Sequence, residues 1–248
     1  MFRAIAAVFF AATLAACSGG DDASAQAEPR DREAIEEIVR AYILENPEII
    51  EEALIELQRR AREREQRATL DAVAANAAAL EGDSGTPVAG ASDPVVTIVE
   101  FFDYRCSFCA LTNDWVQQTL ASHGDQVRFV FKEWPVRGEQ SLEAARASLA
   151  VWQIAPDAYL EFHNALMTAN GPLPSARIDE LAEQSGVNVA DMRAAMDSDA
   201  VREELAEVDD LARQIGVRGT PFFVVGDAVI PGADLDALQE ALDRQLES

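Results

Sequence analysis

The feature that most constrains this fold is an almost continuous apolar run at residues 95–102, rich in β-branched and aromatic side chains. Such a run is typical of a strand that is covered on both faces of its sheet. A second run of this kind spans 127–131, and the segment 109–120 between them has a helical pattern. The order strand, helix, strand predicts a βαβ unit, and therefore a parallel pair of strands in an α/β fold.

The rest of this region predicts a block of helices and then a hairpin. Residues 138–202 are helical in character, with breaks at proline and glycine. Two apolar segments at 221–225 and 228–230, joined by a Gly-Asp turn, predict a two-stranded hairpin, and Asp234 predicts the N-cap of a last helix. We therefore expect residues 93–248 to form one α/β domain with a helical insertion.

Residues 31–82 predict a helical arm ahead of this domain. Asn46 and Pro47 predict the N-cap and the first residue of its second helix. Two narrow apolar seams follow, formed by Ile50, Leu54, Leu57 and Ala61, and by Leu70, Val73, Ala77 and Leu80. Because so narrow a seam cannot bury itself, we expect the arm to join copies of the chain into a dimer or trimer. The alternative is that the arm folds back on the following domain. Glycines and Pro87 within 83–92 predict a linker.

The first residues have the pattern of a bacterial export signal. Residues 1–16 combine a positive start, a short apolar stretch and small residues, and the ending before Cys17 resembles the lipobox of bacterial lipoproteins. We expect Cys17 to be lipidated, 17–30 to be a flexible tether, and the chain to be periplasmic and membrane-anchored by lipid alone. The alternative is cleavage after Ala25, which gives a soluble periplasmic product without Cys17. Both routes export the chain to a compartment in which disulfides persist.

The charge of the chain excludes one class of partner. Its 248 residues include 20 Lys and Arg against 44 Asp and Glu, a formal net charge of −24. Such a surface repels phosphate backbones and anionic lipid headgroups, so we expect no nucleic-acid partner.

Two of the three cysteines form a Cys-x-x-Cys motif where the strand at 95–102 gives way to a helix. Cys106 falls at the predicted helix N-terminus, where unpaired N–H groups and the helix dipole favour an anion. Its thiol should therefore ionise well below the free value of about 8.5. Cys109 lies on the same helical face and one turn deeper, which predicts a resolving cysteine that attacks Cys106 in a mixed disulfide.

Other readings of this pair are a metal site and a structural disulfide. Zinc needs about four ligands, and beyond the pair only His123 and His163 offer nitrogen, neither of them in a ligand-spaced cluster. We expect both histidines to be surface or half-buried residues with no catalytic role, and we expect no cofactor and no bound metal. A Cu(I) site made by the two thiolates remains an alternative.

A second element lies in the turn before the hairpin. A proline that enters an apolar strand after Gly219 and Thr220 suggests a cis peptide bond at Pro221. The pair Cys106 and Cys109, followed after a helical block by Gly219-Thr-Pro and an apolar strand, resembles the active site and cis-proline loop of the DsbA-like thioredoxin superfamily. The arm around residues 42–49, with Glu100-Phe-Phe-Asp-Tyr, is similar to the ScsC and Com1 branch, whose members oligomerise through this segment.

The resemblance implies a thioredoxin fold with a helical insertion and several site residues. Thr220 and Pro221 would lie beside the cysteines, with the Thr220 backbone pairing with an extended client. Glu100 matches the buried acid that accepts a proton from the resolving cysteine, with Lys132 as a candidate partner on which we do not rely. The alternative is an edge-exposed strand glutamate. Ser107 and Phe108 depart from the usual dipeptide, and this leaves the redox potential and the net direction of reaction open.

The resemblance thus implies a thiol-disulfide oxidoreductase that isomerises or forms disulfides in unfolded or misfolded exported proteins. A membrane partner of the DsbB or DsbD type would reset its redox state. Clustered active sites and Thr220 before the proline favour isomerisation. Two alternatives from other classes are a copper-binding tolerance protein that uses the same cysteines, and a holdase in which the cysteine pair is incidental.

Overall fold

The computed structural model describes residues 29–169 and 171–247, and the chain divides into two compact units, one ending at Arg59 and the other beginning at Arg60. The predicted leader at 1–16 and the predicted lipidation at Cys17 lie outside the described residues. Among the residues that are described, no helix is both long and apolar enough to cross a membrane.

The first unit consists of two helical segments, α1 (Pro29–Glu45) and the start of α2 (Glu48–Ala75). The side-chain amide of Asn46 donates a hydrogen bond of 2.9 Å back to the Tyr42 carbonyl at the end of α1. Asn46 therefore satisfies an open carbonyl of the helix before it, and α2 begins next to the predicted position.

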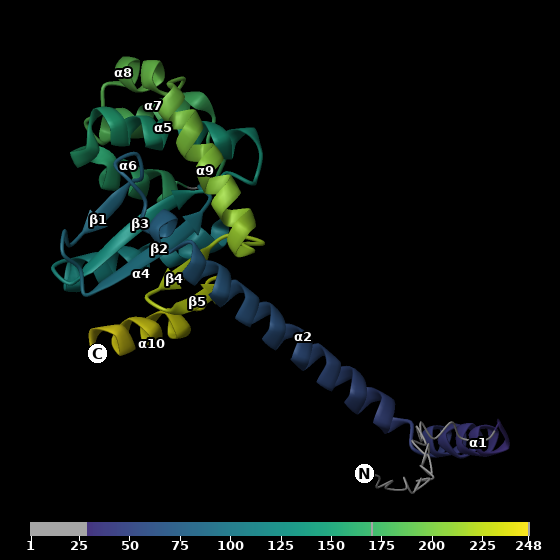
Figure 1. Cartoon of the computed structure of the whole chain (residues 1–248). Coiled ribbons are helices and arrows are strands. Elements are labelled where there is room, and N and C mark those ends of the chain that lie inside the picture. The colour runs from purple at the N-terminus through teal and green to yellow at the C-terminus, as the bar shows by residue number, and fades with distance from the viewer. Residues whose placement is uncertain (1–28, 170, 248) are drawn as a thin grey trace, which may run out of the picture. The chain divides into compact units, whose positions relative to one another are not determined.

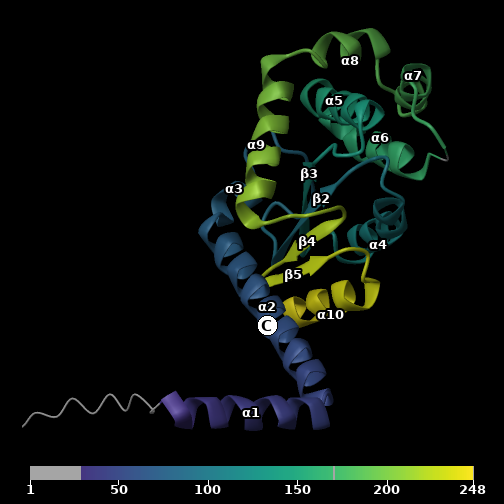
Figure 2. The same ribbon diagram turned by 90° about the vertical axis from the view of Figure 1, so that its right-hand side faces the viewer.

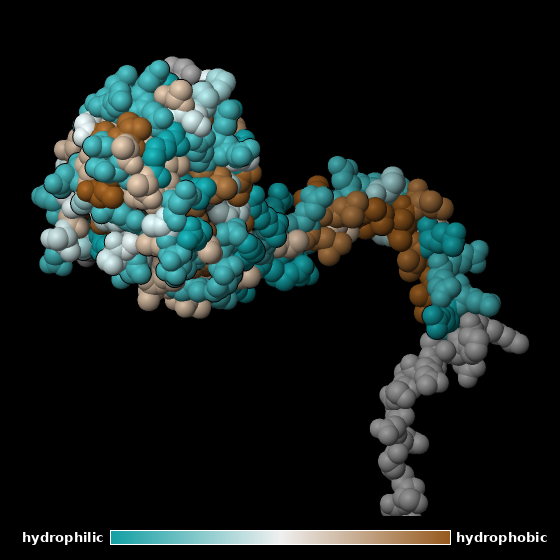
Figure 3. All heavy atoms as spheres, turned by 90° about the horizontal axis from the view of Figure 1, so that it is seen from above, coloured by the Kyte–Doolittle hydropathy of each residue, from teal (hydrophilic) through white to brown (hydrophobic). Residues whose placement is uncertain are grey.

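Large apolar side chains of this unit stay exposed, between 46% and 75%. Figure 3 shows hydrophobic residues gathered along these helices. They are Ile35, Ile38, Val39, Tyr42, Leu44, Ile50, Leu54, Ile55 and Leu57. The first of the two predicted seams is thus open to solvent in a single copy of the chain.

The second unit is built on a mixed sheet in the order β1-β3-β2-β4-β5 (Figure 1). Its strands are β1 (Val88–Gly90), β2 (Val96–Phe102), β3 (Val127–Glu133), β4 (Phe222–Val225) and β5 (Ala228–Pro231). β2 and β3 are parallel, as the βαβ prediction requires, and the pairs β1–β3, β2–β4 and β4–β5 are antiparallel. Strand β1 lies inside the segment 83–92 that we expected to be a linker, because its short backbone pairs with the edge of β3.

Helices fill the remainder of this unit in the predicted order. They are α3 (Ala77–Glu81), α4 (Ser107–His123), α5 (Glu139–Ile154), α6 (Pro156–Thr168), α7 (Ser175–Gln184), α8 (Val189–Ala195), α9 (Asp199–Ile215) and α10 (Leu235–Leu246). Helices α5 to α9 form the insertion between β3 and β4. The predicted cap of the last helix is confirmed, because the Asp234 carboxylate accepts a hydrogen bond of 3.0 Å from the Ala237 amide.

Alternating side chains of the central strands serve two separate cores, one on each face of the sheet. Figure 2 shows α4 and α10 on one side of the strands and α9 with α3 on the other. Ile98, Phe129 and Phe223 belong to the core under α4 and α10. Val99 and Val224 belong to the opposite core, under α9. This period of two is what keeps β2 buried on both faces.

Two residues of the second predicted seam are buried within the second unit. Val73 and Leu80 are only 8% and 4% exposed, and they join Val99 and Val224 in the core under α9. The C-terminal part of α2 therefore has a hydrophobic face to bury against, within the second unit. The boundary between the two units accordingly falls inside the predicted arm 31–82, at Arg59.

Candidate active site

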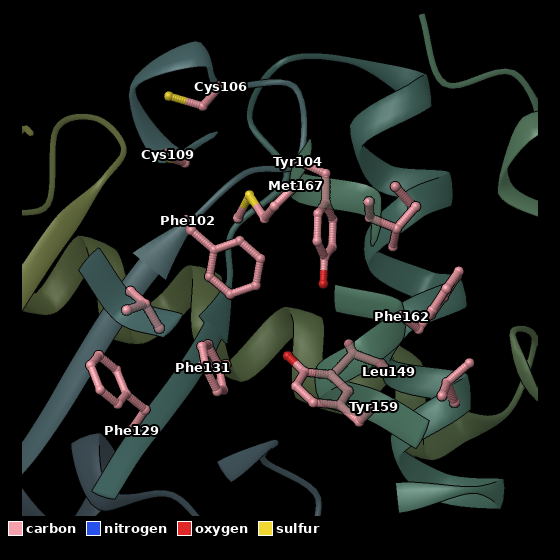
Figure 4. Close-up of a cluster of buried hydrophobic side chains, with 14 of the residues drawn as sticks. Phe102, Tyr104, Cys106, Cys109, Phe129, Phe131, Leu149, Tyr159, Phe162 and Met167 are labelled. Carbon is pink, nitrogen blue, oxygen red and sulfur yellow. The ribbon is translucent and has the colours of Figure 1, made fainter. Parts of the chain in front are cut away.

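Cys106 is the N-cap residue of α4, at the point where the chain leaves β2. Its amide donates to the Asp103 carbonyl at 2.9 Å, and its own carbonyl accepts from the Cys109 amide at 3.0 Å. Both cysteines are free thiols and both are buried, Cys106 1% exposed and Cys109 0%. Figure 4 shows them at one edge of the buried cluster, near Phe102 and Met167.

The pKa of Cys106 is lowered to about 5. A hydrogen bond from the Cys109 thiol stabilises the thiolate most, burial opposes this, and the Thr220 side chain and the backbone amides of Cys109 and Phe108 add to the stabilisation. These amides are the open donors of the first turn of α4, so helix position and thiolate stability have one cause. Cys106 is therefore an anion at neutral pH.

The pKa of Cys109 is raised far above its usual value. Burial is the largest cause, and the bond that Cys109 donates to Cys106 and the negative charge of Glu100 add to it. A hydrogen bond from the Asp103 backbone amide acts in the opposite direction and lowers the pKa of Cys109. The Cys106 thiol is thus ionised and the Cys109 thiol is protonated, which agrees with the predicted roles of nucleophile and resolving cysteine.

The loop before β4 closes over the nucleophile. The Thr220–Pro221 peptide bond is cis, as the Gly-Thr-Pro sequence predicts. The Cys106 Sγ lies 3.2 Å from the Thr220 carbonyl oxygen. The Thr220 hydroxyl is buried, and no hydrogen-bond partner for it lies among the described residues. The Thr220 side chain helps to lower the pKa of Cys106. Segments far apart in the sequence therefore meet at one sulfur.

Glu100 is a buried residue of the central strand β2, 1% exposed, so the edge-exposed alternative is excluded. It lies opposite Phe131 and Phe223 in the sheet register, within an apolar layer. Burial, and then the Cys106 charge, raise the pKa of Glu100 to about 8, against a lowering contact with Thr112. Its Oε1 atom has no partner among the described residues.

Lys132 is not the partner of Glu100. Its position in β3 places it on the opposite face of the sheet from Phe131, which neighbours Glu100. There its ammonium donates to the Thr86 hydroxyl at 3.1 Å and lies 3.8 Å from the Glu204 carboxylate. Lys132 therefore belongs to a buried charge pair below α9.

The dipeptide between the cysteines faces solvent. Ser107 is exposed, and the Phe108 ring is 58% exposed. Leu111, one turn later on α4, is 54% exposed. The entrance to Cys106 is thus bordered by apolar surface, which suits contact with unfolded chains.

Asp103 is a residue of the site that was not predicted from the sequence. Its buried carboxylate accepts bonds from the amides of Arg105, Val136 and Arg137 at 2.7, 2.8 and 2.9 Å, and from the Ser141 hydroxyl at 2.8 Å. These bonds fasten the turn before Cys106 to the start of the helical insertion. An acidic residue directly after an apolar strand was the available signal.

A buried polar cluster below the site was not predicted from the sequence either. The prediction that His163 is a surface or half-buried residue was wrong. That histidine is 1% exposed, and burial lowers its pKa to about 3. Its Nδ1 lies 3.0 Å from the Tyr104 hydroxyl, which also bonds Ser148 at 2.6 Å. Tyr159 donates to Glu133, whose pKa burial raises well above its usual range. A helical pattern cannot show which polar side chains face inward, so no sequence signal marked this cluster.

Among the residues that the structure describes, no three His, Cys, Asp or Glu side chains gather closely enough to hold an ion. His123, the other histidine considered, is half-buried at the far end of α4. Cys106 and Cys109, whose thiols form a hydrogen bond, are two adjoining soft ligands.

Comparison with known proteins agrees with this geometry. A model of the DSBA-like thioredoxin domain matches residues 97–243, and one described as the copper resistance protein ScsC N-terminal domain matches 31–64. Disulfide bond formation protein D of Bacillus subtilis is 30% identical over 173 residues, 65% of this chain and 78% of that protein.

Two solved structures extend the likeness beyond the catalytic unit. Salmonella enterica Typhimurium BcfH has 30% identity and a TM-score of 0.74, over 87% of this chain and 96% of that one. Proteus mirabilis ScsC in a transitional conformation has 31% identity and a TM-score of 0.65, over 89% and 99%. The match thus includes part of the helices that precede the sheet.

Proposed function

The chain belongs to the DsbA-like thioredoxin family of thiol-disulfide oxidoreductases, and on that premise we propose that it isomerises disulfide bonds in exported proteins. The observation that carries this is the position of Cys106 Sγ, at the N-terminus of α4 and 3.2 Å from the Thr220 carbonyl oxygen of the cis-proline loop. A thiolate at a helix N-terminus supplies the nucleophile, and the loop beside it offers a backbone edge to an extended client. Client sequence then matters less than an unfolded segment that contains a cysteine.

The exchange begins when the Cys106 thiolate attacks one sulfur of a client disulfide. A Cys106–client disulfide forms, the client S–S bond breaks, and the second client sulfur leaves as a thiolate that takes a proton from solvent. In isomerisation, another client thiolate attacks the client sulfur, which forms a new client disulfide and releases the Cys106 thiolate. In the reductive branch, the Cys109 thiolate attacks Cys106 Sγ. The Cys106–client bond breaks, the client leaves as a thiolate and is thereby reduced, and the pair becomes a disulfide.

Glu100 is proposed as the proton acceptor in that second branch. While Cys106 is a thiolate, its charge helps to keep Glu100 protonated, with a pKa of about 8. Once Cys106 is bound in a mixed disulfide this charge is gone, and the pKa of Glu100 falls. The carboxylate then takes the Cys109 proton at the moment when Cys109 must become the nucleophile.

Isomerisation is favoured over simple oxidation by the open seam of the first unit. Exposed apolar side chains on α1 and early α2 suit self-association into a dimer or trimer. Several Cys106 thiolates around one misfolded client raise the local concentration of nucleophile. Net oxidation of client thiols is the competing reaction. Because the Cys106 thiolate is stable, the Cys106–Cys109 disulfide is readily reduced and is therefore a good oxidant.

The setting of this reaction follows from the first residues and belongs to the same proposal. Export through residues 1–16 and lipidation of Cys17 would hold the protein at a membrane of the periplasm, while cleavage after Ala25 would leave it soluble there. Exported proteins with cysteines are the proposed clients. A membrane protein of the DsbB or DsbD type is the proposed redox partner. Which type it is depends on whether the cysteine pair must be reoxidised, as in an oxidase, or kept reduced, as in an isomerase.

The test is refolding of scrambled ribonuclease by the reduced protein. We expect ribonuclease activity to return with the parent chain and not with Cys106→Ser, while Cys109→Ser accumulates a mixed disulfide. A matched control is His123→Gln, which lies far from the sulfurs on α4. Trapping of the in-cell redox state then separates the directions, since a mostly reduced pair indicates an isomerase and a mostly oxidised pair an oxidase. Full biological activity of Cys106→Ser would instead support the holdase reading.

A copper-binding role is the second candidate, favoured by the match of residues 31–64 to the ScsC N-terminal domain and by the two adjoining thiols. Two thiolates suit Cu(I), which prefers soft ligands. Binding of one Cu(I) per reduced chain, lost in Cys106→Ser, with no ribonuclease refolding and no insulin reduction, would establish this role in place of the enzymatic one.

A further inference from the structure

A groove of about 480 Å³ runs beside the cis-proline loop in the second unit. One wall is the loop itself, including Gly219, Thr220 and Pro221. The other wall is helix α2, through Arg62, Glu65, Gln66 and Thr69. Figures 1 and 2 show this part of α2 beside β4 and β5. Helix α2 thus contributes side chains to a groove that is linked to Cys106 through Thr220, which lines the groove and whose carbonyl oxygen lies 3.2 Å from Cys106 Sγ.

The floor of the groove is apolar and its mouth is open. Phe222, Val229 and Pro231 line it from the hairpin. A Cβ atom built on Gly219 or on Gly232 would meet nothing within 4 Å, so both glycines border empty space. A groove with an apolar floor and a free backbone edge suits an extended polypeptide with apolar side chains.

The rim of the groove has a local charge opposite to that of the whole chain. Arg62 and Arg218 lie on it with Glu65, and Arg218 forms an ion pair of 2.7 Å with Glu65 from the facing wall. The chain as a whole has a net charge of −24. The charged lining residues therefore sum to one net positive charge, which on so acidic a protein favours an occupant with an acidic side chain beside its apolar ones.

We propose that this groove binds the client segment next to the reacting cysteine, with α2 as one wall of the client site. The proposal rests on the proposed thiol-disulfide exchange. The distance of 3.2 Å from Cys106 Sγ to the Thr220 carbonyl fixes where the client cysteine must enter. Thr220 also lines the groove, so a strand that leaves the sulfur along the loop continues directly between Phe222 and α2. Gln66 and Thr69 are then specificity-determining residues of the enzyme.

The first test is a rate comparison with peptides whose single cysteine is capped by glutathione. Gln66→Trp fills the groove, and Arg67→Trp places the same ring on the neighbouring residue of α2, outside the lining. We expect Gln66→Trp to slow release of glutathione about tenfold for a peptide with leucine beside the cysteine, as loss of one anchoring contact does. Arg67→Trp should match the parent chain with the peptide and with glutathione disulfide alone, whereas the ratio of the peptide rate to the glutathione disulfide rate should fall in Gln66→Trp.

The peptide series adds a test of the rim. An aspartate-bearing peptide should react faster than its lysine-bearing twin, and Arg62→Glu should reverse the order. Equal peptide rates in Gln66→Trp and Arg67→Trp overturn the groove assignment, while absence of any exchange by the parent chain overturns the proposed function with it.

A cross-linking measurement keeps the inference testable even where a tryptophan disturbs folding. A peptide with a photoreactive benzophenone two residues from its cysteine is captured as a mixed disulfide by Cys109→Ser in the full chain. Irradiation should attach it to residues 62–69 of α2, as located by mass spectrometry. Attachment solely on α4 or α6 would place the client on the other side of Cys106 and would overturn the proposal.

Discussion

Cys106 and Cys109 are one helical turn apart, yet their pKa values move in opposite directions, because only the first reaches the open amides of α4. Cys106 accepts from the Cys109 thiol and from the first backbone N–H groups, whereas Cys109 is enclosed by protein and faces the charge of Glu100. A single N-terminal turn thus produces one anion and one neutral thiol.

This asymmetry predicts the titration of the reduced protein. We expect thiolate absorbance at 240 nm to rise with a midpoint near pH 5, and Cys106→Ser to remove that rise. Because the folded pKa of Cys106 lies below its unfolded value near 9, its contribution to stability is complete above that value and is lost as pH falls toward 5. A midpoint near 8.5 would contradict the proposed role of the helix N-terminus.

Glu100→Gln should separate proton transfer from nucleophilic attack. Attack by Cys106 on a small disulfide stays within about twofold of the parent rate, while closure of the Cys106–Cys109 disulfide slows by about 100-fold, a loss typical for a general base. Stopped-flow fluorescence of the mixed disulfide measures the second step. Equal closure rates in both proteins would remove Glu100 from the mechanism.

The same variant carries a stability prediction with a definite sign. The folded pKa of Glu100 is about 8, above the ordinary 4.5, so its contribution is complete below pH 4.5 and is lost as pH rises toward 8. Glu100→Gln abolishes that loss. The difference in Tm between variant and parent should therefore increase from pH 5 to pH 8.

At the scale of elements, the helical insertion is joined to the sheet by the Tyr104 cluster as well as by apolar packing. Tyr104 follows β2, Glu133 ends β3, Ser148 lies on α5, and Tyr159 and His163 lie on α6. Figure 4 shows the Tyr104 hydroxyl directed toward Tyr159. The cluster thus links the segment that carries Cys106 to two helices of the insertion.

Tyr104→Phe tests this link. It removes one hydroxyl and leaves Ser148 and His163 buried without that partner, at a cost of about 1–3 kcal/mol in the free energy of unfolding. Tyr42→Phe is the matched control, because the Tyr42 ring is 57% exposed and its loss of a hydroxyl should change stability by less than about 0.5 kcal/mol. Urea unfolding measures both. Equal values would show that the cluster adds nothing to the packing.

For the whole molecule, the two apolar seams of the arm, the first on α2 and the second on α2 and α3, differ in burial. Val73 and Leu80 are buried in the chain's own second unit, whereas Leu54 and Leu57 are 54% and 58% exposed. Side chains of that size on one exposed stripe are costly to keep in water unless another surface covers them. The early seam is therefore the proposed contact between copies.

Leu54→Asp with Leu57→Asp should reduce the mass in sedimentation to that of a single chain while ribonuclease refolding slows. Thiolate titration of the same variant should be unchanged, because neither leucine lies in the unit that holds Cys106. A parent chain that sediments as a single copy would contradict self-association through this seam.

The sequence by itself determined those features that depend on neighbours along the chain. Nearly continuous apolar runs identified β2, β3 and the hairpin, because burial on both faces favours apolar residues along most of a strand. The Cys-x-x-Cys spacing and Gly-Thr-Pro identified the reactive pair and the cis bond. Strand β1 was taken as linker because its short, glycine-containing segment depends on pairing with β3 rather than on its own pattern.

Tertiary structure alone decided which side chains meet. His163 became a buried partner of Tyr104, Lys132 turned to the face away from Glu100, and Asp103 gathered donors from a distant loop. Val73 and Leu80 of the second seam are buried in the core under α9, whereas Leu54 and Leu57 of the first seam are exposed. Contacts between segments far apart in sequence depend on how elements pack, and no local periodicity encodes the direction in which an inward-facing polar side chain points.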